Sequence, residues 1–182
     1  MTETVSSPAR RSRLWLWIGV ALVACAAGAL AGHFMFSPKP ASEQAVETFF
    51  QTRLPDAAGA DLDLGKLRGK TVVVNFWAPW CGPCVEEMPE LTALHDEFKN
   101  REVEFVGIGI DSAANIQQFT KKVPVAYLLA VAGFAGTELS RNFGNSAGGL
   151  PYTVVINPDG SVKYRKMGRV TAAELRAVLP RT

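Results

Sequence analysis

The sequence predicts an α/β fold in which a mixed central sheet is flanked by helices, and three observations lead to this prediction. Two runs rich in β-branched and aromatic residues, Thr71–Trp77 and Val103–Ile110, have the continuous apolar character of buried central strands. A helical pattern follows each of them. Near the C-terminus, a hairpin signal precedes a helix-start signal. Strand, helix, strand, hairpin and helix in this order indicate one sheet with helices on both faces.

The helices that follow the two strands can be located from their patterns. Over residues 82–99 the apolar positions recur every three or four residues, so one face of this helix is expected to pack on the sheet. Pro89 lies inside this pattern and predicts a kink. Either Asp111 or Ser112 can cap the second helix, which runs to about Lys122.

The second half of the chain continues the alternation of strands and helices. A short strand is expected over Val125–Ala130 and a helix over Thr137–Phe143. Two further strands, Tyr152–Ile156 and Val162–Met167, flank an Asn-Pro-Asp-Gly turn, in which proline presets the turn and glycine takes a positive φ. Thr171, followed three residues later by a glutamate, forms a capping box that opens the last helix.

One globular domain with an N-terminal appendage accounts for the 182 residues, since domains cluster at roughly 100–150 residues. Four segments are predicted: a cytoplasmic tail (1–13), a transmembrane anchor (14–36), a tether (37–48) and the domain (49–182). The anchor contains no Lys, Arg, Asp or Glu and exceeds the about 20 residues that cross a bilayer as a helix. Basic residues precede it, which places the tail in the cytoplasm and the domain outside. The tether is polar and needs no regular element.

Two alternatives to an uncleaved anchor remain. A basic stretch followed by an apolar run is also typical of a cleaved signal peptide. Leu22–Cys25 has the pattern of a lipoprotein lipobox, with Cys25 as the acyl acceptor. The apolar run continues well beyond Cys25, which favours a single-pass anchor in the inner (cytoplasmic) membrane. All three interpretations place the domain in the periplasm or another extracytoplasmic space.

The charge pattern bears on possible partners. The net charge of +2 comes from the first 36 residues, where three arginines oppose one glutamate. The rest of the chain carries equal numbers of basic and acidic residues. A nucleic-acid-binding domain would show a clustered basic face. No nucleic-acid partner is therefore expected.

The motif Cys81-Gly82-Pro83-Cys84 lies where a buried strand ends and a helix begins. This position directs backbone N–H groups and the helix dipole at the first sulfur, which favours its thiolate. In such a motif Cys81 attacks a substrate disulfide, and Cys84, one turn into the helix, resolves the mixed disulfide. The motif predicts a two-electron redox switch that needs no cofactor.

A Cys-x-x-Cys pair can also belong to a zinc site, a haem attachment site or a structural disulfide. A zinc site lacks partners, because the remaining cysteine and histidine residues are Cys25, His33 and His95, and His95 is expected at the surface. Haem attachment would need a histidine where Val85 stands. A structural disulfide usually closes a longer loop. No metal is expected at the pair.

Two other functions can be compared with the redox interpretation. The peroxiredoxin signature Pro-x-x-x-Thr-x-x-Cys is absent. A copper chaperone would use Cys81 and Cys84 as soft ligands for Cu(I), with Met88 or Met167 as a further ligand if folding brings one of them close. This metallochaperone stays the alternative.

The segment Phe76–Cys84 (FWAPWCGPC) resembles the active-site segment of thioredoxins. With its flanks and the later segment GGLPYTVVINPDG, it is similar to the TlpA/ResA-like branch of membrane-anchored, extracytoplasmic thioredoxins. The resemblance implies a thiol-disulfide oxidoreductase with the thioredoxin fold. It also implies an N-terminal β-hairpin extension and a central insertion within residues 111–145.

The resemblance extends to single positions. Pro151 matches the cis-proline of the family, and Leu150 would present its backbone to a substrate as a short added strand. Glu87 matches an acidic residue near the cysteines, which would transfer protons or raise a thiol pKa, although a solvated helix carboxylate is the alternative. Cytoplasmic thioredoxins carry a buried aspartate where this chain has Asn75. Because Asn75 cannot take the proton of Cys84, Glu87 is the leading candidate for that role.

The resemblance and the motif together predict a reductase of protein disulfides. Gly82 and Pro83 stand where oxidants of the DsbA type carry a histidine between the cysteines. Trp80 either shields the pair and contacts partners or packs in the core. The family implies electrons from a membrane-embedded thiol donor and clients in cytochrome c maturation or copper-oxidase assembly. A monomer is expected.

Overall fold

The computed structural model describes residues 15, 17–28, 40–99 and 101–180. The chain divides into two units, Met1–Lys39 and Pro40–Thr182. In the first unit, the described residues are helical. No helix in the part of the chain that the structure describes is both long and apolar enough to cross a membrane. The predicted tail and parts of the predicted anchor lie outside the described residues.

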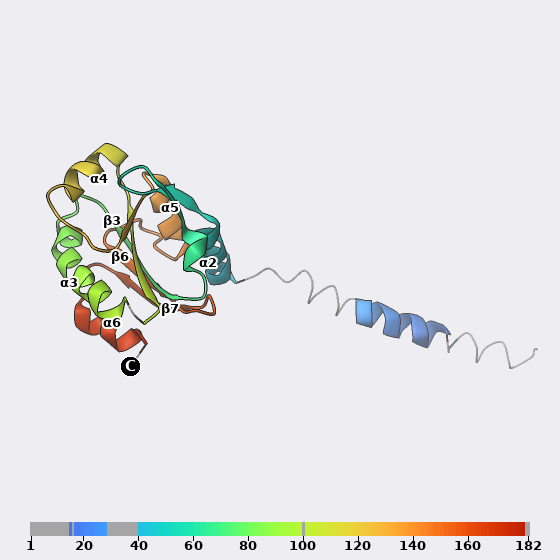
Figure 1. The fold of residues 1–182 in the computed structure, drawn as a ribbon. Coiled ribbons are helices and arrows are strands. Elements are labelled where there is room, and N and C mark those ends of the chain that lie inside the picture. The colour runs from blue at the N-terminus through green and yellow to red at the C-terminus, as the bar shows by residue number, and fades with distance from the viewer. Residues whose placement is uncertain (1–14, 16, 29–39, 100, 181–182) are drawn as a thin grey trace, which may run out of the picture. The chain divides into compact units, whose positions relative to one another are not determined.

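Five strands of the second unit form one mixed sheet in the order β5-β4-β3-β6-β7 (Figure 1). Their bounds are Thr71–Trp77 for β3, Val103–Gly109 for β4, Leu128–Val131 for β5, Tyr152–Ile156 for β6 and Val162–Met167 for β7. Strands β3, β4 and β5 are parallel, whereas β6 and β7 add to β3 in antiparallel pairs. Every residue of the central strand β3 is buried, as its run of apolar residues predicts.

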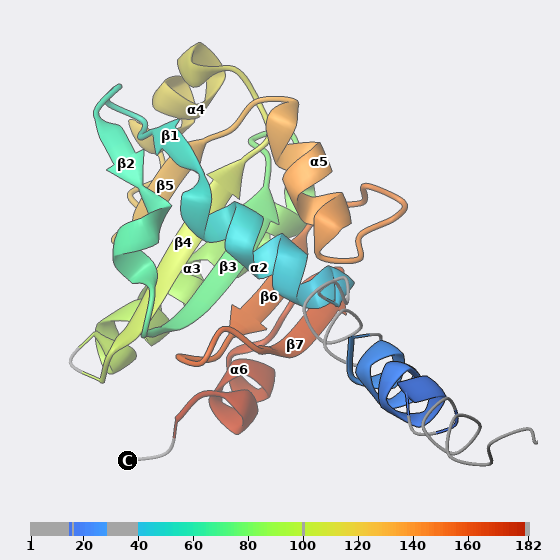
Figure 2. The same ribbon diagram turned by 90° about the vertical axis from the view of Figure 1, so that its right-hand side faces the viewer.

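Helices cover both faces of this sheet (Figures 1 and 2). One face carries α3 (Gly82–Phe98), α4 (Ala113–Thr120) and α6 (Ala172–Val178). The other face carries α2 (Ala41–Gln51) and α5 (Ala135–Asn142). The predicted α/β fold with a mixed, helix-flanked sheet is confirmed.

Alternate residues of β3 supply the two cores of the domain. Val73 and Trp77 belong to the core beneath α3, whereas Val72, Val74 and Phe76 belong to the core beneath α2 and α5. Successive side chains of a strand point to opposite faces, so one buried strand serves both cores. The site described below lies on the α3 side.

Helix α2 begins inside the segment predicted as a tether over residues 37–48. Its four buried residues are all apolar and recur at a spacing that places them on one helix face: Ala45, Val46, Phe49 and Phe50. Phe49 packs edge to face against both Phe50 and Phe143. The expectation that no regular element occurs before residue 49 is therefore wrong. The polar residues and prolines of this segment suggested a tether, but its apolar residues form one face of a helix that packs on the domain.

A two-stranded hairpin of β1 (Arg53–Pro55) and β2 (Asp61–Asp63) precedes the main sheet, as the resemblance implies. Arg53 forms ion pairs with both Asp61 and Asp63 across it. A single 3-10 turn, Leu64–Leu67, connects the hairpin to β3. Within residues 111–145, where an insertion is expected, α4 leads to the edge strand β5, which begins three residues later than predicted.

The last elements follow the sequence closely. Strands β6 and β7 have the predicted bounds. The capping box at α6 is present, since the Thr171 hydroxyl accepts from the Glu174 N–H and the Glu174 carboxylate accepts from the Thr171 N–H. Hydrogen bonds from Lys166 and Thr171 lower the pKa of Glu174 to about 2.

Candidate active site

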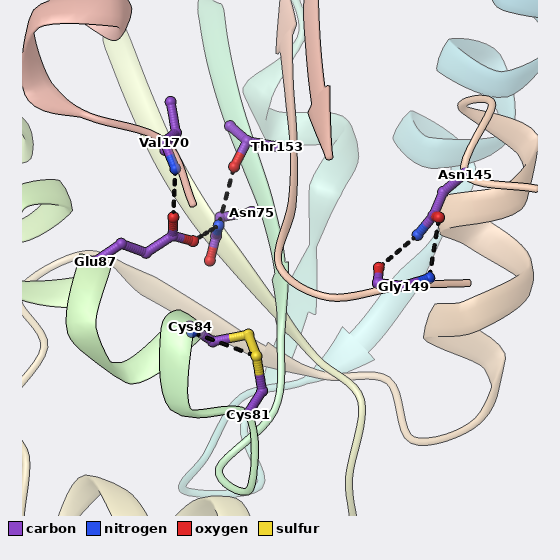
Figure 3. Close-up of a disulfide and its surroundings, with 8 residues drawn as sticks. All are labelled: Asn75, Cys81, Cys84, Glu87, Asn145, Gly149, Thr153 and Val170. Atoms are coloured by element: carbon purple, nitrogen blue, oxygen red, sulfur yellow. Dashed lines mark hydrogen bonds between the residues drawn. A yellow bond between two sulfur atoms is a disulfide. The ribbon is translucent and has the colours of Figure 1, made fainter. Parts of the chain in front are cut away.

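Cys81 and Cys84 form a disulfide at the start of α3 (Figure 3). Cys81 is the N-cap residue of the helix, and its sulfur accepts a hydrogen bond from the Cys84 N–H at 3.3 Å. Pro83 stands in the first turn, where a helix needs no N–H donor. The strand β3 thus delivers one sulfur to the positive end of a helix, as the sequence predicts.

The residues around the pair differ in their accessibility. Cys81 is 6% exposed and Cys84 is 0% exposed. Trp80, directly before Cys81, is 69% exposed, so the alternative of a buried packing role for Trp80 is wrong. Gly82 and Pro83 are exposed as well. Cys81 is therefore the more accessible of the two cysteines, and it directly follows the exposed Trp80.

Glu87 lies one turn after Cys84 on the same side of α3 and is 0% exposed. Its carboxylate accepts hydrogen bonds from the Asn75 side chain at 2.7 Å and from the Val170 N–H at 2.8 Å. Burial raises the pKa of the Glu87 carboxyl, and these two hydrogen bonds offset part of the rise. The alternative of a solvated helix carboxylate is wrong, because the segment before α6 covers this turn of α3.

Asn75 connects Glu87 to the sheet. Its Nδ2 donates both to Glu87 and, at 3.1 Å, to the Thr153 hydroxyl on β6. Both acceptors lie on one side of the amide, and Figure 3 shows the amide oxygen on the side that faces the disulfide. This buried oxygen has no hydrogen-bond partner among the described residues. Sequence reasoning missed Thr153, because nothing in the sequence links positions so far apart.

The segment before α6 is fastened to α3 by carboxylates. Arg169 pairs with Glu86 and Glu90, and the Ala172 N–H donates to Glu90 at 2.9 Å. These contacts hold the Val170 N–H over Glu87. Glu87 thus receives one hydrogen bond from the sheet, through Asn75, and one from the segment before α6, through Val170.

The Leu150–Pro151 peptide bond is cis, the isomer that the resemblance implies. The loop before it is closed by the buried Asn145, whose side chain donates to the Gly149 carbonyl at 2.9 Å and accepts from the Gly149 N–H at 3.1 Å (Figure 3). Leu150 lines, together with Trp80, a groove of about 510 Å³. Trp80 and Leu150 therefore lie on the same concave surface.

Two other sequence expectations concern His95 and metal ligands. His95 is half-buried and packs edge to face on Phe105, so its expected surface position is wrong. Among the described residues, no group of three or more His, Cys, Asp or Glu side chains is arranged to hold a metal ion. Met88 is buried in the same core as Cys84, whereas Met167 is exposed.

Residues 40–179 match the family model described as Redoxin. The chain belongs to the redoxin family. This redoxin is 30% identical over 165 residues to the thiol-disulfide oxidoreductase ResA of Bacillus subtilis (strain 168), a match that covers 89% of each protein. It is 28% identical over 174 residues to ResA of a Bacillus cereus strain, covering 93% of this chain and 96% of that protein.

Solved structures agree with this assignment. A thioredoxin-related protein from Neisseria meningitidis serogroup B superposes with a TM-score of 0.60 at 33% identity, covering 69% of this redoxin and 94% of that chain. A thiol:disulfide interchange protein of the thioredoxin family from Chlorobium tepidum TLS gives a TM-score of 0.60 at 27% identity, covering 70% and 89%. The redoxin has the thioredoxin fold and is a thiol-disulfide oxidoreductase of the TlpA/ResA-like family.

Proposed function

We propose that this redoxin is an extracytoplasmic reductase of protein disulfides. The observation that carries the proposal is the asymmetry of the pair, because Cys81 caps α3 and keeps a small exposed fraction of 6%, whereas Cys84 is fully buried. The Cys81 thiolate attacks one sulfur of a client disulfide, forms a mixed disulfide and releases the other client sulfur as a thiolate. Cys84 then attacks Cys81, which closes the Cys81–Cys84 disulfide and releases the second client thiol. Two electrons pass to the client.

Glu87 is proposed to take the proton that Cys84 loses before it attacks. Cys84 is inaccessible to water, and Glu87 is the buried carboxyl nearest to it along α3. The raised pKa of Glu87 brings its protonation equilibrium nearer to neutral pH, where a carboxyl can both accept and return a proton. Gly82 and Pro83 shape the turn that separates the two sulfurs.

Trp80, Leu150 and Pro151 are proposed to bind the client. An extended client segment would add to the backbone of Leu150 as a short strand, the mode in which main-chain hydrogen bonds supply affinity. The exposed indole of Trp80 would cover the client on the other side of Cys81. The groove that Trp80 and Leu150 share supports the assignment of these two residues.

Localisation and electron supply complete the proposal. Residues 14–36 would anchor a monomer in the cytoplasmic membrane, with the domain in the periplasm or another extracytoplasmic space. A membrane-embedded thiol donor would reduce the pair after each cycle. Clients in cytochrome c maturation or copper-oxidase assembly are proposed from the resemblance to the TlpA/ResA-like proteins.

The reduction potential of the Cys81–Cys84 pair tests the direction of electron flow. The domain from residue 40 would be equilibrated with glutathione or dithiothreitol buffers and the oxidised fraction measured by thiol alkylation. A value near that of thioredoxin, about −270 mV, is expected for a reductase, whereas a value near −120 mV would make the protein an oxidant. A Cu(I) titration of the reduced domain addresses the alternative, since tight Cu(I) binding without disulfide turnover would favour the metallochaperone.

A further inference from the structure

A groove of about 510 Å³ is lined by Trp80, the residue that precedes Cys81, and by residues from three further connections of the fold. Trp80 comes from the turn before α3, Ile110 from the end of β4, Phe134 from the turn before α5 and Leu150 from the loop before Pro151. These four residues define what we call the aromatic groove. They lie close together because β3, β4 and β5 are parallel, so their carboxyl ends lie at the same end of the sheet.

Two aromatic side chains that line the aromatic groove are exposed to solvent. Phe134 is 94% exposed and Trp80 is 69% exposed. Phe134 is the N-cap residue of α5 but makes no capping hydrogen bond with its side chain, so a polar residue would serve the helix better there. Single exposed apolar residues are ordinary, but aromatic residues that share one hollow are typical of binding surfaces.

The negative charge of one lining residue, Asp111, limits which ligands the aromatic groove can bind. Asp111 is the one ionisable side chain among the described residues that line it. Its carboxylate is fixed by hydrogen bonds from the Ser112 N–H at 2.6 Å and the Asn115 side chain at 2.7 Å. A carboxylate held at an apolar hollow repels an acidic ligand and leaves a neutral apolar one unaffected.

The position of the groove identifies the occupant as part of a client. Trp80 directly precedes Cys81 and Leu150 directly precedes Pro151, so a client whose disulfide reaches Cys81 lays its flanking residues across these two side chains. In an extended segment, alternate side chains point the same way and lie roughly 7 Å apart. A client residue two positions from the attacked cysteine therefore faces the same surface as that cysteine.

We infer that the aromatic groove binds a bulky apolar side chain that the client carries two residues from its reactive cysteine, and that Phe134 is the residue that selects it. This inference rests on the proposed reductase function and adds the class of client to it. A segment with an acidic residue at that position is disfavoured by Asp111.

Peptide disulfides that differ only at this position provide the test. The full chain, reduced with dithiothreitol and freed of it, would be mixed with peptides that carry Phe, Ser or Glu two residues from the attacked cysteine. The second-order rate constant would be followed by tryptophan fluorescence in stopped flow. The Phe peptide is expected to react about tenfold faster than the Ser peptide, with the Glu peptide slowest.

Variants assign the preference to the groove. Phe134→Ala should lower the rate for the Phe peptide about tenfold and leave the Ser peptide and oxidised glutathione unchanged. Leu128→Ala, which truncates an exposed apolar residue of β5 outside the groove, is the matched control and should change nothing. Asp111→Asn should raise the rate for the Glu peptide roughly threefold.

Each contrary result has its own meaning. Equal rates for the three peptides, or a preference that Phe134→Ala leaves intact, would overturn the groove assignment while the reductase function stands. Failure of the wild-type chain to reduce any peptide would overturn the reductase function itself. A dimer in solution that Phe134→Ala converts to a monomer would show a second copy as the occupant and would also overturn the inference.

Discussion

The two faces of the central sheet differ in what they bury, although one strand builds both. On the α2 and α5 side, β3 presents Val72, Val74 and Phe76, a wholly apolar set. On the α3 side, the same strand presents Asn75 between Val73 and Trp77. The residues that β3 presents to the first face follow the ordinary rule that cores exclude polar groups, whereas Asn75 departs from it on the face that carries the disulfide.

The departure extends beyond Asn75. Among the described residues, the buried side-chain polar atoms that lack a hydrogen-bond partner all lie on the α3 side: Asn75 Oδ1, Trp77 Nε1, His95 Nδ1 and Tyr127 Oη. The comparison teaches that these unpaired polar atoms lie on the face of the sheet that also carries the Cys81–Cys84 disulfide.

The largest effect is expected at the cysteines, where the α3 side has its chemistry. Cys81→Ser should abolish reduction of insulin by dithiothreitol-recycled protein, because the attacking sulfur is gone. Cys84→Ser should still attack but accumulate a mixed disulfide, visible by mass spectrometry under non-reducing conditions. Accumulation in Cys81→Ser instead would reverse the assigned order of the two sulfurs.

A large stability effect without a redox effect is expected on the opposite face. Phe49→Ala removes a fully buried ring of α2 and should lower the free energy of unfolding by about 3–5 kcal/mol in urea. The reduction potential of the pair should not change. A shifted potential would mean that the two faces are coupled and would break the comparison.

Glu87 should give the α3 side a distinctive pH dependence. Because burial raises its pKa, the folded chain holds this proton more tightly than the unfolded chain. The free energy of unfolding should therefore fall as pH rises from the ordinary carboxyl pKa through the raised one, and then level off. Glu87→Gln should lack this fall in urea titrations of the oxidised protein between pH 4 and pH 8.

Glu174 provides the control of opposite sign. Its pKa is lowered to about 2, so its contribution to stability is present above the ordinary carboxyl pKa and is lost on acidification toward pH 2. Glu174→Gln should therefore lower the free energy of unfolding by a constant amount above pH 5, where this contribution is present, and should lack its loss on acidification toward pH 2. An unchanged profile in Glu87→Gln would contradict the raised pKa.

The smallest expected effect concerns the start of α6. Thr171→Ala removes the capping hydroxyl and should lower the free energy of unfolding by about 1 kcal/mol. Equal losses in the oxidised and reduced forms are expected, because the cap does not contact the sulfurs. A loss confined to one form would extend the redox-sensitive part of the α3 side to this helix.

Local patterns in the sequence predicted much of this architecture. Strands β3, β6 and β7 and the capping box follow from short-range signals that burial reinforces. Helix α2 was not predicted, because its buried apolar residues follow a polar segment that contains prolines. The burial of Glu87 was not predicted either, because it depends on Val170, which no local pattern places over α3.

The site shows the same division. The motif identified Cys81 and Cys84 directly, and the resemblance identified Pro151. By contrast, the contact of Asn75 with Thr153 joins the neighbouring strands β3 and β6 through two residues that are 78 positions apart in the sequence. The exposure of Phe134 is equally invisible in the sequence, because an isolated phenylalanine before a helix predicts a core residue. The reactive cysteines lie in one short motif and could therefore be predicted from the sequence. The residues that surround them come together only in the folded chain and could not.

The Asn145 side chain has a consequence for how such proteins diverge. It pairs with both backbone groups of Gly149 and so closes the loop over residues 146–148 at its base. We therefore expect changes of sequence within that loop to leave the backbone positions of Leu150 and Pro151 unaltered. Gly148, inside the loop, lines the aromatic groove. Given the inferred role of the groove, we expect substitutions in this loop to change client preference while the chemistry of Cys81 and Cys84 stays the same.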